Sequence, residues 1–149
     1  MRAVVQRVSS ARVTVDGLMV GEIGSGLLVL LGASCSDGHD DVTYVVRKIL
    51  GLRVFDNSDG KMDLSVIGVD GAVMVVSQFT LYGDARRGRR PSFDEAATPK
   101  RARPLYDSVV EGIRDAGLKV VTGEFGAMMD VSLVNNGPVT LLLDSTKQF

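Results

Sequence analysis

Apolar residues along the 149-residue chain recur with two spacings, and each spacing predicts one kind of secondary structure. Short runs rich in valine and leucine, bounded by Gly, Asp or Asn, are typical of β-strands. Such runs occupy the ranges 2–8, 11–15, 18–23, 27–33, 72–76, 118–121, 128–134 and 139–143. The Asp16-Gly17 pair between two of them is a strong signal for a β-hairpin. The segment from Met62 to Asp70 has no regular pattern.

Two further segments have apolar residues every three or four positions, which is the pattern of an amphipathic helix. The first helix is expected to begin at Ser36 or Asp37, and the second at Pro99 after an N-cap at Thr98. Gly117 is expected to end the second helix. The residues expected to face the core are Val42, Val45, Val46, Ile49 and Leu50 in the first helix and Leu105, Tyr106, Val109, Val110 and Ile113 in the second.

These elements predict a single α+β domain over residues 1–149, because no linker, repeat or low-complexity segment separates them. The sheet is expected to be antiparallel or mixed and barrel-like, with two main helices. No apolar run approaches 18 residues and the N-terminus lacks an apolar signal segment, so neither a membrane span nor a signal peptide is expected. Cys35 is the only cysteine, which favours a reducing, cytoplasmic setting. It is expected to pack as a small apolar side chain.

Several common catalytic chemistries lack the residues that they need. His39 is the only histidine and lies in an acidic segment, so Ser-His-Asp and Cys-His mechanisms lack their base. One histidine and one cysteine four residues apart do not make a zinc site, and no Walker or dinucleotide-binding glycine pattern occurs. No metal and no cofactor is therefore expected. An enzyme with this sequence would act without a general base of the usual kind.

The segment Ser77-Gln78-Phe79-Thr80 directly follows the apolar run 72–76. A strand that ends in these residues places hydroxyls, an amide and free backbone N–H groups at a sheet edge. Those are the groups that an oxyanion site needs. The alternative is that serine and threonine are simply common at strand ends.

The segment from Asn135 to Thr140 lies between two apolar runs and contains Gly137-Pro138. Proline removes a ladder donor, which a central strand does not tolerate, and glycine adopts backbone angles closed to other residues. The pair is either an ordinary Asn-Gly-Pro turn or a cis Gly-Pro peptide that turns successive carbonyl oxygens to one side.

Arginines concentrate in one stretch of a chain whose net charge is close to zero. The loop from Gly83 to Arg90 contains Arg86, Arg87, Arg89 and Arg90, and Lys100, Arg101 and Arg103 follow it. A basic run is most often a solvated face. Because this one follows the Ser-Gln-Phe-Thr segment, it could instead hold a phosphate backbone near the reacting atom.

Taken together, the two motifs resemble the signatures of the D-aminoacyl-tRNA deacylase family, Ser-Gln-Phe-Thr and Asn-x-Gly-Pro-Val-Thr. Other segments agree with that family in the same order along the chain, at 6–8, 21–24, 26–32, 60–62, 90–93 and 123–127. The matches cover nearly all of the chain. Asn136 and Met128 depart from residues that are common in the family, and both flank the motifs rather than replace them.

The resemblance implies an ester hydrolase that releases D-amino acids, or glycine, from the terminal adenosine of tRNA. The ribose 2′-hydroxyl would assist, and backbone N–H groups around Gln78, Phe79 and Thr80 would stabilise the oxyanion. Ser77 belongs to the same catalytic segment. Thr80 either positions the substrate or acts as a nucleophile, and the absence of a base favours positioning.

The resemblance also implies that Gly137 and Pro138 hold the substrate's α-ammonium through main-chain carbonyls and exclude L side chains. In the family this motif comes from the partner subunit, so a homodimer is expected, with tRNA as the other partner and Arg86, Arg87, Arg89 and Arg90 as candidates for binding it. Arg7 matches a residue that braces the Gly-Pro element, and Met129 matches one near the terminal adenine. A strand-face salt bridge and a core methionine are the alternative roles of these two residues.

Two other classes of function compete with the deacylase. The first is a non-catalytic RNA- or DNA-binding module that uses the basic stretch 86–103. It would have no need for Gly137-Pro138, so a substitution there distinguishes it from the enzyme. The second is a dimeric structural protein, which would explain neither motif.

Overall fold

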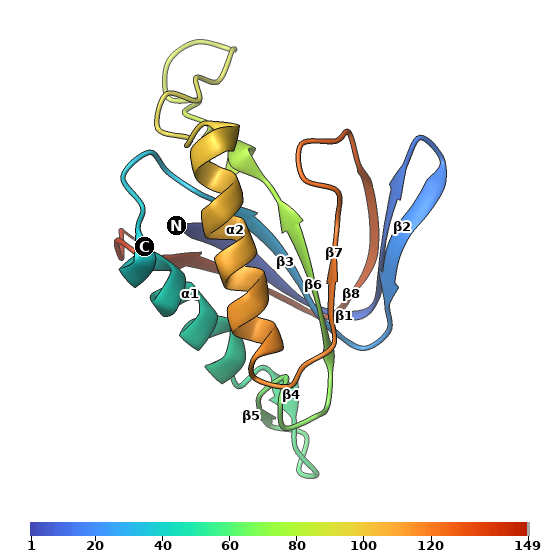
Figure 1. The fold of residues 1–149 in the computed structure, drawn as a ribbon. Helices are drawn as coiled ribbons and strands as arrows, with labels where there is room; N and C mark the ends of the chain where they lie inside the picture. The colour runs from blue at the N-terminus through green and yellow to red at the C-terminus, as the bar shows by residue number, and fades with distance from the viewer. Residues whose placement is uncertain (149) are drawn as a thin grey trace.

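One long, bent strand, β1 (Arg2–Val15), organises the sheet in the computed structural model, which describes residues 1–148 (Figure 1). Along one edge, β1 pairs antiparallel with β3 (Gly26–Gly32) through its first half and with β2 (Leu18–Ile23) through its second. Along the other edge, β8 (Asp130–Asp144) pairs with both halves. The two strands expected at 2–8 and 11–15 are therefore one continuous strand.

The sheet continues from β3 through β6 (Ala72–Ser77) to β7 (Val120–Thr122), and both of these strands run parallel to their neighbours. The order is β2-β1-β3-β6-β7, with β8 paired to β1. The sheet curls until β2 meets β7. Their closeness is seen at Gly21 of β2, where an added Cβ atom would clash with the Val121 side chain and lie 3.3 Å from the Thr122 carbonyl oxygen. The predicted α+β fold with a mixed, barrel-like sheet is confirmed.

Helices α1 (His39–Gly51) and α2 (Pro99–Arg114) lie side by side on one face of the sheet (Figure 1). α2 begins at Pro99 as predicted and ends three residues before Gly117. α1 begins later than predicted because the Asp37 carboxylate is held in the preceding turn. It accepts the Ser34 N–H at 2.6 Å and the Met1 ammonium at 2.8 Å.

Three short elements complete the chain. β4 (Phe55–Asp56) and β5 (Met62–Leu64) form a separate two-stranded sheet, so the segment expected to be irregular contains a strand. The 3₁₀ helix η1 (Phe79–Tyr82) follows β6. Cys35 is exposed, and the expectation that it packs as a core residue was wrong.

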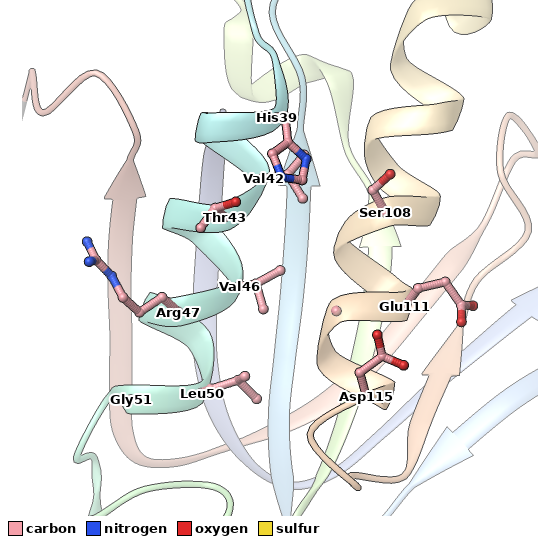
Figure 2. A pocket seen from close by; sticks show the side chains of 11 residues that line it. His39, Val42, Thr43, Val46, Arg47, Leu50, Gly51, Ser108, Glu111 and Asp115 are labelled. Carbon is pink, nitrogen blue, oxygen red and sulfur yellow. The ribbon is translucent and has the colours of Figure 1, made fainter.

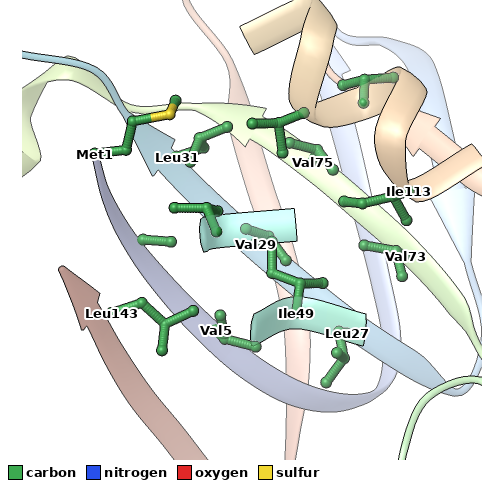
Figure 3. Packing of buried hydrophobic residues seen from close by; sticks show 14 of the residues in the cluster. Met1, Val5, Leu27, Val29, Leu31, Ile49, Val73, Val75, Ile113 and Leu143 are labelled. Atoms are coloured by element: carbon green, nitrogen blue, oxygen red, sulfur yellow. The ribbon is translucent and has the colours of Figure 1, made fainter. Parts of the chain in front are cut away.

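The core has two parts, one on each face of the curled sheet. The larger part lies between the sheet and the two helices, and Figure 3 shows Val29, Val75 and Ile49 meeting there. The smaller part fills the inside of the curl with residues such as Leu28, Met74 and Val76. A buried strand with apolar residues on both faces, as in β3, supplies both parts at once.

β8 runs without interruption through Gly137-Pro138, whose peptide bond is cis. The two strands expected at 128–134 and 139–143 are therefore one strand. Its pairing with β1 nevertheless shifts register on both sides of Val8. The motif thus sits in a local irregularity of the ladder, where a proline is tolerated. Among residues 1–148, no helix is long and apolar enough to cross a membrane.

Candidate active site

The Ser-Gln-Phe-Thr motif forms the junction between a buried strand and a short helix. Ser77 is the last residue of β6, Gln78 has an irregular conformation (φ −143°, ψ 80°), and Phe79 and Thr80 open η1. The Gln78 side-chain amide donates to Thr80 Oγ1. Sequence reasoning placed the motif at a strand end, and the structure describes it there.

The backbone N–H groups of this turn differ in their availability. The N–H of Gln78 donates to the Leu31 carbonyl at 2.8 Å, so it continues the sheet ladder. The N–H groups of Phe79 and Thr80 lie in the first turn of η1, where a helix has no internal acceptor for them. Within residues 1–148, neither has a hydrogen-bond partner. Of the three backbone N–H groups expected to stabilise an oxyanion, those of Phe79 and Thr80 are therefore available, and that of Gln78 is not.

A cavity of about 780 Å³ opens beside this turn. Its walls come from the ends of β3 and β6, the start of α2 and the loop before β8, and they include Ala97, Phe125, Met128 and Met129. Met128 is 90 % exposed at the mouth, whereas Met129 packs on the inner part of the core. A mostly apolar cavity with a few polar groups at one end suits an organic ligand with a reacting polar group.

The Gly137-Pro138 segment is held in place by Arg7, whose side chain is mostly buried. Arg7 Nε donates to the Asn136 carbonyl at 3.2 Å, and Nη1 donates to the Val54 carbonyl at 2.6 Å. Nη1 also lies 3.3 Å from a carboxylate oxygen of Asp56. Gly137 itself has φ +114°, in the region that favours glycine. Arg7 thus links three separate parts of the chain at this motif.

Asn135 fixes the same segment from the other side, and sequence reasoning assigned it no role. Its side-chain amide donates to the carbonyls of Arg7 at 3.0 Å and Val139 at 2.9 Å, so it spans the irregular part of the strand. Its amide oxygen accepts the Thr140 hydroxyl at 3.1 Å. The signal was present in the sequence, because asparagine is depleted in strand interiors and needs a specific reason to be there.

Within one chain, the two motifs lie near opposite ends of β3. Arg7, which contacts the Gly-Pro segment, pairs with Leu27 at the start of β3, whereas Ser77 pairs with Leu31 near its end. Four residues of strand separate these positions by about 13 Å. The residues that line the cavity include neither Arg7 nor Gly137 nor Pro138.

The arginine loop projects from the end of β6, beside the Ser-Gln-Phe-Thr turn (Figure 1). The Arg86 guanidinium donates two hydrogen bonds to the Asp84 carboxylate, from Nε at 2.8 Å and from Nη2 at 2.7 Å. These hydrogen bonds lower the pKa of Asp84 to about 2. In the described part of the chain, Arg87, Arg89 and Arg90 form no ion pair and are exposed. The loop therefore offers three uncompensated cations rather than four.

A second concavity of about 740 Å³ lies between α1 and α2, and Figure 2 shows its side chains. Its floor is apolar, and its rim includes His39 and Arg47 of α1, Glu111 of α2 and Asp115, which caps the end of α2. The only histidine of the chain is therefore on the helical face, away from both motifs. Among residues 1–148, no cluster of three or more His, Cys, Asp or Glu side chains could hold a metal ion.

Comparison with known proteins identifies the family. Residues 4–144 match the family described as D-Tyr-tRNA(Tyr) deacylase. The chain belongs to the D-aminoacyl-tRNA deacylase family. These enzymes are ester hydrolases. A D-aminoacyl-tRNA deacylase from Thermosipho africanus is 56 % identical over 149 residues, which is the whole of both chains.

Two solved structures resemble this member of the deacylase family over nearly its whole length. One is described as a c-Myc DNA unwinding element binding protein. It has a TM-score of 0.91 and 42 % identity, and the match covers 97 % of this chain and 98 % of that one. The other is described as a "probable eukaryotic D-amino acid tRNA deacylase". It has a TM-score of 0.83 and 17 % identity, and the match covers 95 % and 97 % of the two chains. At that identity, the second likeness supports the fold alone.

Proposed function

We propose that this protein hydrolyses the ester bond between a D-amino acid and the terminal adenosine of tRNA, releasing the amino acid and the tRNA. The observation that carries the proposal is the pair of N–H groups of Phe79 and Thr80, which have no hydrogen-bond partner in the described part of the chain and lie beside an apolar cavity. Two such donors can stabilise the oxyanion that forms when an ester is attacked. The cavity can accept the adenosine, with Met129 contributing to the wall beside the base.

The reaction needs no general base from the protein if the ribose 2′-hydroxyl of the substrate assists the attacking water. The only hydrogen bond described for the Thr80 hydroxyl comes from Gln78, and no carboxylate or imidazole contacts it within residues 1–148. This environment supports a positioning role for Thr80 rather than a nucleophilic one. Ser77 and Gln78 fix the turn by anchoring it to β6 and β3.

Selection of the D enantiomer would come from the Gly137-Pro138 segment of a partner subunit. Its main-chain carbonyls would hold the α-ammonium, so that an L side chain points into the backbone and a D side chain points to solvent. Glycine has no side chain to exclude and would be released as well. The separation of about 13 Å along β3 supports a partner's contribution, because the ammonium and the ester carbonyl sit on adjacent carbons of the substrate. Arg7 would hold the segment in place.

The remaining part of the substrate is the tRNA body, which the arginine loop would hold. Arg87, Arg89 and Arg90 are the uncompensated cations, and phosphate oxygens are their natural partners. Arg86 is already bound to Asp84 and would contribute less. The tRNA substrate and the lone cysteine are consistent with a cytoplasmic setting.

The decisive experiment compares D-tyrosyl-tRNA with L-tyrosyl-tRNA as substrates and follows release of tyrosine, with and without a chelator. The expected result is rapid release from the D form, little from the L form, and no effect of the chelator. Equal rates on the two enantiomers would refute the proposal. Loss of activity in the chelator that zinc restores would refute its metal-free part.

A second candidate is binding of DNA without catalysis. It is favoured by the 42 % identity to a structure described as a DNA unwinding element binding protein, together with the exposed arginines. Such a function depends on the arginine loop and not on Gly137. If Gly137→Ala leaves affinity for single-stranded and duplex DNA unchanged while the protein releases neither tyrosine enantiomer from tRNA, this candidate replaces the deacylase.

A further inference from the structure

Phe93, on the returning side of the arginine loop, packs against the turn that carries the two free N–H groups. Its ring centroid lies 5.1 Å from that of Phe79, with the ring planes at 66°, which is a favourable edge-to-face arrangement. A Cβ atom on Gly83 would lie 3.0 Å from Phe93 Cε1, so the ring also fills the space beside the residue that caps η1. Phe93 therefore contacts the chain on both sides of Thr80.

The base of the arginine loop holds Phe93 in this place. Asp84 and Ser92 exchange two backbone hydrogen bonds, at 2.8 and 3.0 Å, which join the two arms of the loop directly before Phe93. The Ala96 N–H donates to the Phe93 carbonyl at 3.0 Å, and the Ala97 N–H donates to the Ala33 carbonyl at 2.9 Å. The backbone that carries Phe93 is thus fixed at the base of the loop and beside the end of β3.

The turn needs such support. Phe79 is 54 % exposed, and η1 is a single 3₁₀ turn, which has weaker hydrogen-bond geometry than an α-helix. We propose that Phe93 is a positioning residue that holds the N–H groups of Phe79 and Thr80 and couples them to the arginine loop. The part of this inference that concerns catalysis rests on the proposed function.

The coupling gives the arginine loop an effect on rate as well as on affinity. Phosphates bound by Arg87, Arg89 and Arg90 would order the two arms whose base is the Asp84–Ser92 pair. Phe93 follows that pair directly, so ordering the arms also orders the turn at Phe79. We expect full-length D-tyrosyl-tRNA to be hydrolysed faster at saturation than D-tyrosyl-adenosine, which has no phosphates.

The test compares Phe93→Ala and the milder Phe93→Leu with Tyr44→Ala, which removes a half-buried aromatic ring from α1. Single-turnover rates at saturation and half-saturating concentrations are measured on both substrates. Amide hydrogen exchange of the segment 77–83 is measured in the absence of substrate. Losing one oxyanion donor costs about 10²–10³-fold in rate, so its partial displacement by Phe93→Ala should cost about tenfold on D-tyrosyl-adenosine. The loss on D-tyrosyl-tRNA should be larger, because the rate advantage of that substrate depends on the coupling through Phe93, and half-saturation should change little.

The N–H groups of Leu81 and Gly83 donate to the carbonyls of Gln78 and Thr80 and so report the order of the turn. Faster exchange at Leu81 and Gly83 in Phe93→Ala but not in Tyr44→Ala is the expected structural result, with Phe93→Leu intermediate. Exchange and saturating rates that match those of Tyr44→Ala would overturn the proposal. If the wild-type protein hydrolyses neither substrate, the proposed function fails, and the exchange measurement still decides whether Phe93 positions the turn. The proposal would also be overturned if Phe93→Ala raised the half-saturating concentration of substrate and left the saturating rate unchanged.

Discussion

Replacing Gly137 with alanine tests how the Gly-Pro segment is held. At φ +114° an L residue is strained by about 1–3 kcal/mol. The new Cβ would also lie 2.7 Å from Arg7 Nη2 and 2.9 Å from Val139 Cγ2. Arg7 is only 8 % exposed and cannot move away without weakening its bonds to the Asn136 and Val54 carbonyls. Weakening one hydrogen bond of a charged group costs roughly a further 1 kcal/mol or more.

We therefore expect Gly137→Ala to lower the free energy of unfolding by about 2–4 kcal/mol, which corresponds to a fall in Tm of roughly 5–15 °C. It should also lower the rate on D-tyrosyl-tRNA and weaken rejection of the L form, because the displaced segment no longer fits the α-ammonium. Denaturant unfolding and single-turnover release of tyrosine measure the two effects separately.

Gly117→Ala is the matched control. Gly117 has φ +84°, yet a Cβ atom there would meet nothing within 4 Å, so this variant carries the backbone strain without the clash. It should lose about 1–2 kcal/mol of stability and keep the wild-type rate and enantiomer ratio. The reasoning is refuted if the two variants are equally stable and Gly137→Ala still discriminates normally between the enantiomers.

Three further predictions follow from the site and the core. Replacing Arg87, Arg89 and Arg90 together with glutamine should reduce the slope of log affinity for tRNA against log salt by about 2–3, which is roughly 0.7–0.9 for each cation; Arg86→Gln alone should reduce it by less than that single share, and a fall of about 0.9 would contradict the pairing of Arg86 with Asp84. Thr80→Ala should lower the rate only in part and leave the enantiomer ratio intact; complete loss of turnover would instead support a nucleophilic threonine. Burial raises the pKa of Tyr106 to about 12, so the stability that its neutral form provides should be complete below pH 10 and lost between pH 10 and 12. Alkaline unfolding curves of Tyr106→Phe should be flatter in that window, although the variant loses the hydrogen bond to the Val75 carbonyl.

Local signals in the sequence predicted most of the elements, because hairpins and helix starts depend on nearby residues. The Asp16-Gly17 hairpin and the start of α2 at Pro99 are of this kind. The first helix was misplaced because Asp37 is held by Ser34 and by Met1, and the second contact joins residues that are 36 positions apart in the sequence. The continuity of β1 and of β8 was missed for a similar reason. These two strands pair with each other along almost their whole lengths, and this long-range pairing makes each of them one strand.

The sequence predicted which residues belong to the candidate site, but not which groups those residues contact. The two motifs stood out because their residues are unusual at strand positions. The Gln78 N–H donates to the Leu31 carbonyl, and this hydrogen bond follows only from the parallel pairing of β3 and β6. Likewise, the acceptors of Arg7 lie 47 and 129 residues along the chain, and no local pattern links them to it.

The separation of the two motifs within one chain leads to a test of where a complete site is formed. Phe79→Pro removes one of the two free N–H groups at the first position of η1, where proline is compatible with a helix. Gly137→Ala disturbs the other motif. If each site combines the Ser-Gln-Phe-Thr turn of one subunit with the Gly-Pro segment of its partner, a dimer of the two variants contains one site with both motifs intact. Random reassociation of equal amounts makes about half of the dimers mixed, so about a quarter of the sites should regain the wild-type rate. Variants mixed without dissociation are the control and should show only their residual activities. If reassociation restores nothing although mixed dimers form, each site lies within one chain, and the Gly-Pro segment does not act on the turn of a partner.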